Sequence, residues 1–427
     1  MYRIAPWIVG AAGLALAGST WAEPTDGWRD LGGELRGLHS HRSANPNGPL
    51  AQAQALAPDR FAGSVNSTQV ETELRGRWRF ISADAVFGHE HPEGGPGDSH
   101  ARFNELHASA DLGAWQLSAG KKTVSWDVGY AFRPNDVVQQ EQRRSLLDTP
   151  LEGRPLLQAE YFEAERATSL VWVQPQHLNR DTADQRGVNE SALALRHYER
   201  QGALDAYAFA RLGQHTGTSV GAALAWVATE SLELHASGRW MQRFDGWQRP
   251  ASAAPLASAN PWAIGTHGHA GQLLIGGQWT GEQRQSVLLE VWRDTTAPRA
   301  AQWRAWQADN VGLNQLGQRP GVPAAAVAGN LAWQTSPLGD GGTLGPMSLQ
   351  RNNVFARVAW QPEGWQYSLD VLWHPADDGF IATAGLQWQG HLWRWDMAWR
   401  WYGGPSHAVL AQLPQKNTLA LMLNRSF

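Results

Sequence analysis

Residues 67–80 read Ser-Thr-Gln-Val-Glu-Thr-Glu-Leu-Arg-Gly-Arg-Trp-Arg-Phe, and their alternation decides the fold class. Successive side chains of a β-strand point to opposite faces, so one face carries Glu71, Glu73, Arg75, Arg77 and Arg79. A protein core cannot hold such a row, because each unpaired buried charge costs several kcal/mol. The opposite face, from Val70 to Phe80, is too apolar for water. A wall between lipid and an aqueous lumen satisfies both faces.

The same alternation recurs along the chain, at 102–112, 203–212, 232–243, 365–373 and 392–402. It also ends the chain, where Leu419, Leu421, Leu423 and Phe427 alternate with Thr418, Ala420, Met422, Asn424 and Ser426, and only Arg425 breaks the apolar face. One such strand also fits an ordinary β-sandwich, but the recurrence favours a membrane wall. Segments of this kind number about 16–18, each of roughly ten residues. The sequence therefore predicts an all-β protein, a transmembrane antiparallel up-and-down β-barrel.

The connections between these segments alternate in length. Tight links are expected near 80–82, 113–114, 164–165, 201–202, 229–230, 281–282, 363–364 and 390–391, and long links near 42–66, 92–100, 125–154, 175–188, 244–268, 295–351 and 403–415. Short turns on one side and long loops on the other are typical of bacterial barrels. Many of the 24 tryptophans, among them Trp78, Trp115, Trp360 and Trp393, lie beside a short turn. They indicate an aromatic girdle at one membrane interface.

Residues 1–22 have the features of a secretory signal peptide: a basic start at Arg3, an apolar core from Ile4 to Gly18, and small residues before a cleavage site at Ala22. Residues 23–427 are then expected to form one barrel. No later stretch holds eighteen consecutive apolar residues, which excludes a helical inner-membrane protein. The chain has no cysteine, so disulfides and thiol catalysis are excluded. With a net charge of −4 and no basic face, nucleic acid is not an expected partner.

Two stretches resemble features of known Gram-negative barrels. The terminal aromatic Phe427 resembles the C-terminal signal read by the barrel-assembly machinery. Segment 119–138 resembles a pattern of the alginate-export-like barrel group at Gly120, Lys121, Lys122, Trp126, Pro134 and Asp136. The order of Pro134 and Asn135 is reversed relative to that pattern, and Lys122 replaces a glutamine. The resemblance implies a transport barrel in the bacterial outer membrane. Its expected partners are outer-membrane lipid, the assembly machinery, and a small solute or polysaccharide.

The expected solute path is a charged lumen. It comprises the inward-facing charges of segment 67–80 and the cations and acid of the following long loop: Glu71, Glu73, Arg75, Arg77, Arg79, Lys122, Arg133, Glu141, Arg143 and Arg144. More arginines than glutamates on the ladder predict a modest preference for anions. In loop 125–154 a short helix is expected over 137–147, with Asn135 or Asp136 as its N-cap. The loop either folds inward and narrows the lumen or stays outside in solvent.

Loop 295–351 is the longest connection, and a helix is expected at 299–309 with Trp303 and Trp306 on one face. This loop is either a lid across the mouth or packed at the surface. Histidines 39, 41, 89, 91 and 100 lie near strand ends with Glu90 and Asp98, but their spacing does not specify a metal site, and no metal or other cofactor is expected. No Gly-x-Ser-x-Gly motif occurs, and no enzyme is expected. The predicted function is an outer-membrane channel for a hydrophilic or amphipathic solute. The alternative is a non-conducting barrel whose loops bind a partner or surface polymer.

Overall fold

The computed structural model describes residues 29–61, 66–139, 146–147, 151–174, 190–249, 256–338 and 348–427. The expected signal peptide, residues 1–22, lies outside these residues, as do Glu141, Arg143 and Arg144 of the expected solute path.

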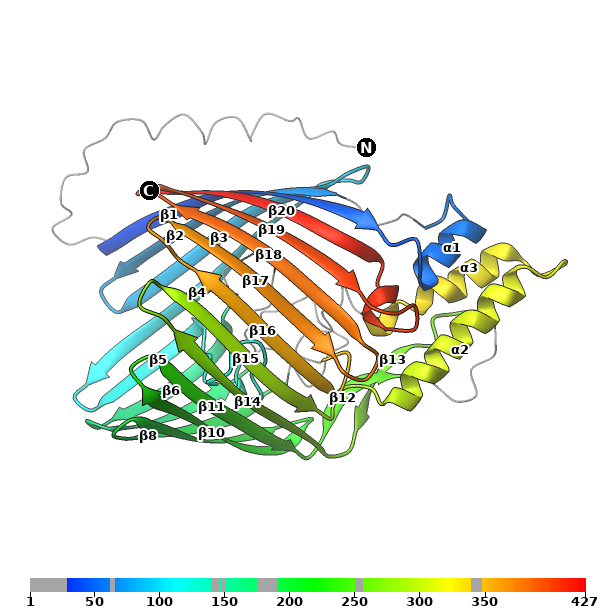
Figure 1. Ribbon diagram of the computed structural model, residues 1–427. Helices are drawn as coiled ribbons and strands as arrows, with labels where there is room; N and C mark the ends of the chain where they lie inside the picture. The colour runs from blue at the N-terminus through cyan, green and yellow to red at the C-terminus, as the bar shows by residue number, and fades with distance from the viewer. Residues whose placement is uncertain are drawn as a thin grey trace, which may run out of the picture.

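Eighteen strands form one closed antiparallel barrel (Figure 1). They are β1 (Arg29–Ala44), β2 (Ser67–Trp78), β3 (Ile81–Pro92), β4 (Asp98–Leu112), β5 (Trp115–Lys122), β6 (Arg154–Phe162), β7 (Arg166–Val173), β8 (Ala192–Gln201), β9 (Leu204–Gly213), β10 (Gly217–Thr229), β11 (Leu232–Met241), β14 (Ala270–Thr280), β15 (Gln285–Asp294), β16 (Asn352–Trp360), β17 (Trp365–His374), β18 (Gly379–Gln389), β19 (Trp393–Gly403) and β20 (Gln415–Ser426). Each strand pairs with its neighbour in the chain, and β1 pairs with β20 from Glu34↔Ser426 to Ala44↔Gln415, which closes the wall. The predicted fold class is confirmed.

The two faces of the wall differ as the alternation predicts. On β2, Val70 and Leu74 are 49% and 45% exposed on the outer face, whereas Glu71 and Glu73 are buried on the inner face. On β20, Leu421 and Leu423 are exposed while Met422 and Asn424 are buried. Because lipid offers no hydrogen-bond partners, an apolar outer face on a closed barrel is the surface that a bilayer requires.

The two ends of the barrel also differ. Short turns join β2 to β3, β4 to β5 and the later pairs at one end, and both chain termini of the barrel lie there. Trp115, Trp226, Trp360 and Trp393 lie beside these turns and are 43–50% exposed, as expected for an interfacial girdle. The long connections gather at the opposite end, where the helices extend beyond the barrel rim (Figure 1).

The long connections carry their own secondary structure. They contain α1 (Pro49–Leu56), the hairpin β12 (Phe244–Gln248) and β13 (Ala263–His267), α2 (Ala300–Gly317), α3 (Ala324–Trp333) and the short 3₁₀ turns η2 (Ser336–Leu338) and η3 (Leu410–Gln412). The helix expected at 299–309 is therefore confirmed and is longer than expected, and it buries Trp303 and Trp306 on one face. None of the helices among the described residues is long and apolar enough to cross a membrane.

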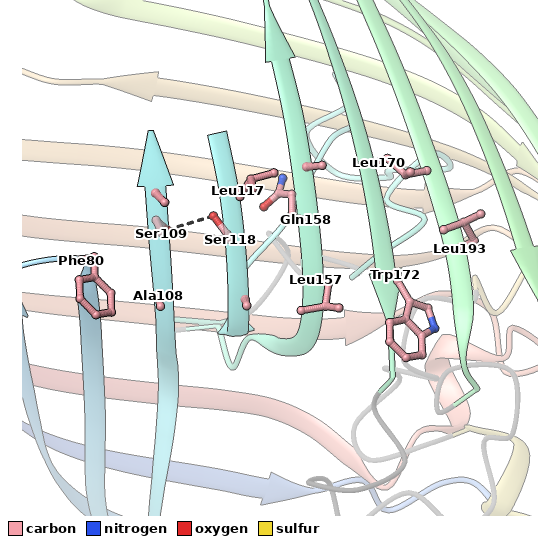
Figure 2. A pocket seen from close by; sticks show the side chains of 13 residues that line it. Phe80, Ala108, Ser109, Leu117, Ser118, Leu157, Gln158, Leu170, Trp172 and Leu193 are labelled. Carbon is pink, nitrogen blue, oxygen red and sulfur yellow. Dashed lines mark hydrogen bonds between the residues drawn. The ribbon is translucent and has the colours of Figure 1, made fainter. Parts of the chain in front are cut away.

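A hollow of about 530 Å³ lies on the outer face of β4 to β8 (Figure 2). Small side chains, including Ala108, Ala110 and Ala119, form part of its lining, and Leu157 and Trp172 stand around it, 50% and 43% exposed. These outward-facing side chains belong to the apolar surface of the wall. The hollow is thus a feature of the lipid-facing side and lies apart from the barrel interior.

Candidate functional site

The connection after β5 turns into the barrel and packs on its inner wall. Residues 123–139, here called the inward segment, include Val124, Trp126, Phe132 and Val137, all buried. Val124, Trp126 and Val137 pack against inward side chains of β6 to β10, namely Leu156, Val171, Val173, Ala194, Phe209 and Ala223. Ala131 and Phe132 pack against those of β14 to β17, namely Leu274, Leu288, Trp292, Phe355 and Leu372. Of the two readings of this loop, the inward one is confirmed for these residues.

Asp136 holds the inward segment in shape. Its Oδ1 accepts the backbone N–H groups of Trp126 (2.8 Å) and Asp127 (3.0 Å), and its Oδ2 accepts Arg133 Nε (2.6 Å). Arg133 also donates to the carbonyl of Gly129 (2.8 Å). The carboxylate therefore ties the end of the segment back to its beginning.

The helix expected over 137–147 is wrong for the described residues 137–139, which are not helical. The expectation relied on Asn135 or Asp136 as an N-cap. The side chain of Asp136 instead accepts hydrogen bonds from residues ten and nine positions earlier, and Asn135 bonds to the barrel wall. The oxygens of Asp136 are engaged elsewhere and the Asn135 side chain points to the wall at Gly221, so neither caps a following turn.

Glu290 of β15 pins the inward segment to the wall. This carboxylate is fully buried, and it accepts the backbone N–H groups of Tyr130 (2.6 Å) and Ala131 (2.7 Å). His235 Nε2 of β11 lies 2.9 Å from the same carboxylate. Hydrogen bonds to a charged acceptor are stronger than those between neutral groups. Glu290 of β15 therefore binds the middle of the segment directly, and His235 of β11 contacts the same carboxylate.

A second attachment joins the inward segment to β10 and β11. Asn135 Nδ2 donates to Ser237 Oγ (2.9 Å) and to the carbonyl of Gly238 (3.1 Å), and Ser237 Oγ donates to Asp127 Oδ1 (2.6 Å). Gly221 leaves room for this contact, since a Cβ there would lie 1.9 Å from Asn135 Oδ1. Burial raises the pKa of Asp127 above its ordinary value, although hydrogen bonds from Ser237 and from backbone N–H groups oppose the shift.

Aromatic contacts complete the packing. The rings of Phe132 and Trp292 stack with centroids 5.3 Å apart. The Tyr130 hydroxyl accepts a hydrogen bond from Arg357 Nη1 (2.8 Å), and that guanidinium also pairs with Asp370 (3.1 Å). The inward segment is therefore fixed against the wall from β6 to β17, along more than half of the strands of the barrel.

The inner faces of β1 and β2 carry a cluster of charges. Arg36 of β1 pairs with Glu73, with Glu34 (3.1 Å) and with Glu71 (3.4 Å). Arg75 lies 3.6 Å from Glu73 and 3.8 Å from Glu34, and its side chain is 55% exposed. The carboxylates of Glu71 and Glu73 are covered by their partners, whereas the guanidinium of Arg75 meets solvent.

The cluster continues on to β4, β5 and the end of the β5–β6 connection. Arg102 lies 4.0 Å from Glu71 and 3.9 Å from Glu152, and Lys121 pairs with Glu152. Lys122 donates to Gln158 Oε1 (2.9 Å) and to Ser118 Oγ (3.3 Å). We call the inward-facing charges of β1 to β5 with Glu152 the charged wall.

Several predicted path residues are therefore brought together and others are not. Glu71, Glu73, Arg75 and Lys122 lie on the charged wall, and Arg77 is exposed near the short-turn end of β2. Arg79 lies in the turn between β2 and β3, where its φ of 53° leaves the strand conformation and its guanidinium lies 5.3 Å from the Trp78 ring. Arg133 belongs to the inward segment. Its hydrogen bonds lie within that segment, and its place on a solute path stays a prediction.

Sequence reasoning missed the residues that hold the inward segment and balance the charged wall: Glu34, Arg36, His235, Ser237 and Glu290. For Arg36 a signal existed, because it alternates with apolar residues in the first strand. For Glu290 no local signal existed, since its partners Tyr130 and Ala131 lie 160 and 159 residues earlier. Among the residues that the structure describes, no group of three or more His, Asp or Glu side chains is placed to hold a metal ion.

The long connections interlock at the mouth. Helices α1, α2 and α3 share an apolar cluster of Ala53, Leu313, Val327, Ala328 and Leu331. Asn45, after β1, donates to the carbonyls of Ala411 (2.8 Å) and Leu413 (2.7 Å) before β20. The mouth is thereby joined across the seam between the first and last strands.

No protein-family model matches this chain, and no curated protein shows significant sequence similarity to it. Solved structures with the same architecture are known. OccAB1 of Acinetobacter baumannii is similar at a TM-score of 0.53 and 12% identity, over 96% of this chain and 99% of that chain. OccK5 (OpdH) of Pseudomonas aeruginosa is similar at a TM-score of 0.53 and 10% identity, over 94% and 98%. At these identities the similarity shows a shared barrel fold.

Proposed function

We propose that this protein is an outer-membrane channel that conducts a hydrophilic or amphipathic solute between the inward segment and the charged wall. The observation that carries the proposal is the exposure of Arg75. Its side chain lies on the inner face of β2 yet is 55% exposed. An inner face packed solid would cover it, so the exposure supports a water-filled space beside the charged wall.

On the inner face of β2 the exposed charge is positive. Glu71 and Glu73 have side chains only 8% and 5% exposed and face Arg36, whereas Arg75 and Arg77 are exposed. Charges that line a pore set its ionic preference. We therefore propose a modest preference for anions or for the anionic group of a larger solute.

The long connections, at the end opposite the short turns, could restrict which solutes enter the barrel. The inward segment narrows the interior along β6 to β17, and helices α1 to α3 pack together beyond the barrel rim at this end (Figure 1). The resemblance of segment 119–138 to alginate-export-like barrels also supports transport, without specifying a solute.

Single-channel recording in planar bilayers tests this proposal with purified full-length protein. We expect stepwise currents and a reversal potential that shows a modest anion preference across a salt gradient. Protein that inserts, shows the heat-modifiable migration of a folded barrel, and carries no current would contradict the channel. That outcome would favour the alternative, a scaffold whose loops bind a partner or polymer.

A further inference from the structure

A second recessed site lies at the mouth, between the hairpin β12–β13 and the first half of α2. It encloses about 270 Å³ and is lined by four tryptophans and a few polar side chains. This volume is close to the lower end of the usual range for small-molecule sites, roughly 300–1,000 Å³. The site is separate from both the charged wall and the inward segment.

The indole rings are held in fixed positions. Trp303 Nε1 donates to the carbonyl of Leu349 (2.8 Å), and Trp306 Nε1 donates to the carbonyl of Gln334 (2.9 Å). Trp262 Nε1 donates to the side chain of Gln334 (3.2 Å). The rings of Trp303 and Trp306 meet edge to face at 5.5 Å. Trp303 and Trp306 are buried and form the base of the site, so the ring surface that a ligand can reach comes from the half-buried Trp247 and Trp262.

The polar groups around the indoles are balanced in charge. Arg249 pairs with Asp309, whose side chain is 45% exposed. Arg249 Nε is shielded from solvent and has no acceptor among the described residues. Gln302 also lines the site, and its carbonyl oxygen accepts the backbone N–H of Arg299 (2.7 Å), which leaves its NH₂ group to donate. Donors and acceptors thus surround an aromatic surface with no net charge.

We propose that this site binds a pyranose ring of a saccharide and concentrates it at the mouth of the channel. A pyranose has one face of C–H groups, which packs on an indole ring, and a rim of hydroxyls, which both donate and accept hydrogen bonds. Arg249 and Gln302 donate to such hydroxyls, and Asp309 accepts from them. A neutral ligand matches the neutral Arg249–Asp309 pair, which provides no net charge to hold a quaternary ammonium ion over the rings. Binding of the pyranose does not depend on the proposed channel, whereas its concentration at the channel mouth rests on that proposed function.

Isothermal titration of the full-length protein in detergent tests the binding step directly. The probe is maltotetraose, and tetraethylammonium and benzoate are compared with it. We expect maltotetraose to bind and the two ions to bind at least tenfold more weakly. Tighter binding of tetraethylammonium would identify a cation cage, tighter binding of benzoate would identify an aromatic-acid site, and no maltotetraose binding would reject the saccharide. Each of these results overturns the proposal.

Variants locate the binding. Asp309→Asn keeps the shape of the side chain and removes its charge, and Trp247→Ala removes one of the four indoles of the lining. Each is expected to weaken maltotetraose binding at least tenfold. Gln315→Ala, at an exposed position on the same helix but outside the site, is the matched control and should bind like the native chain. Unchanged affinity in Asp309→Asn would overturn the proposed location, even if Trp247→Ala failed to fold.

Planar bilayers separate this inference from the channel itself. Maltotetraose added on the loop side should interrupt the current of the native protein, and should do so at least tenfold less in Asp309→Asn. A conducting channel with no saccharide binding would reject the site and leave the channel standing. Saccharide binding without conduction would reject the channel and leave the site standing.

Discussion

Replacing Glu290 with alanine should release the inward segment while the barrel stays assembled. The substitution removes the acceptor of two backbone N–H groups, at Tyr130 and Ala131, and the partner of His235. Hydrogen bonds to a charged group contribute about 1.5–3 kcal/mol each, so the two amide bonds alone contribute about 3–6 kcal/mol. Each 1.4 kcal/mol changes an equilibrium tenfold. The balance between packed and detached segment should therefore shift on the order of 100-fold or more toward detachment.

Single-channel recording measures this change. We expect Glu290→Ala to show a higher mean conductance and more frequent transitions between current levels than the native protein. Glu290→Gln keeps one carbonyl oxygen near the two amides and should give an intermediate result. Glu363→Ala, in the short turn between β16 and β17, is the control and should behave like the native chain. If Glu290→Ala assembles and its current histogram equals that of the native protein, the inward segment does not depend on Glu290.

Four further predictions concern charge, pH, topology and assembly. Arg75→Glu combined with Arg77→Glu should move the reversal potential toward cation preference while the barrel stays intact. Leu74→Arg should instead reduce assembly, because an outward arginine costs about 2–4 kcal/mol near the bilayer midplane. An unchanged reversal potential in the double variant would show that these arginines do not line the path. Burial raises the pKa of Asp127, so the packed inward segment is most stable below the ordinary carboxyl pKa and loses stability as the pH rises through the raised value. Current noise should therefore fall as the pH is lowered toward the ordinary carboxyl pKa of about 4, and Asp127→Asn should abolish this dependence. Cysteines at Glu282 or Glu363 should resist impermeant thiol reagents on intact cells while ones at Gln315 or Arg319 react, and labelling in the opposite sense would reverse the orientation. Deleting Phe427, whose backbone pairs with Gly33 at 3.0 Å in both directions, should lower the yield of heat-modifiable barrel far more than deleting a loop residue, and an unchanged yield would reject the insertion signal.

The wall of the barrel was predictable because its information is local. The alternation of Glu71 and Glu73 with Val70 and Leu74 needs no partner to be interpreted, since lipid and water sort the two faces independently of distant strands. Arg79 continues the same alternation in the sequence but lies in the turn after β2, where its φ is 53°. The geometry of the hairpin turn, and not the alternation of side chains, decides where the strand ends. The strand ends were therefore less predictable than the strand centres.

The interior was less predictable because its contacts are distant. The N-cap pattern at Asn135 and Asp136 is equally compatible with a helix and with a folded loop, and the choice depends on Ser237, 102 residues later. The pairing of Arg36 with Glu71 and Glu73 depends on the β1–β2 register, which also decides how much of the glutamate charge reaches solvent. A sequence pattern identifies which residues face inward, but it does not say which of them neutralise one another.

The one-sided packing of the inward segment has a mechanical consequence. A hollow cylinder with an internal brace along part of its circumference resists flattening there and deforms in the remaining arc. Strands β6 to β17 are braced by the inward segment. The remaining arc includes β19, β20, β1 and β2 with the seam between them, and it contains the pairs of Arg36 with Glu71 and Glu73 on the charged wall. Slow elastic changes in the cross-section should therefore concentrate in this remaining arc, and should widen or narrow the space beside Arg75 while the braced arc keeps its shape.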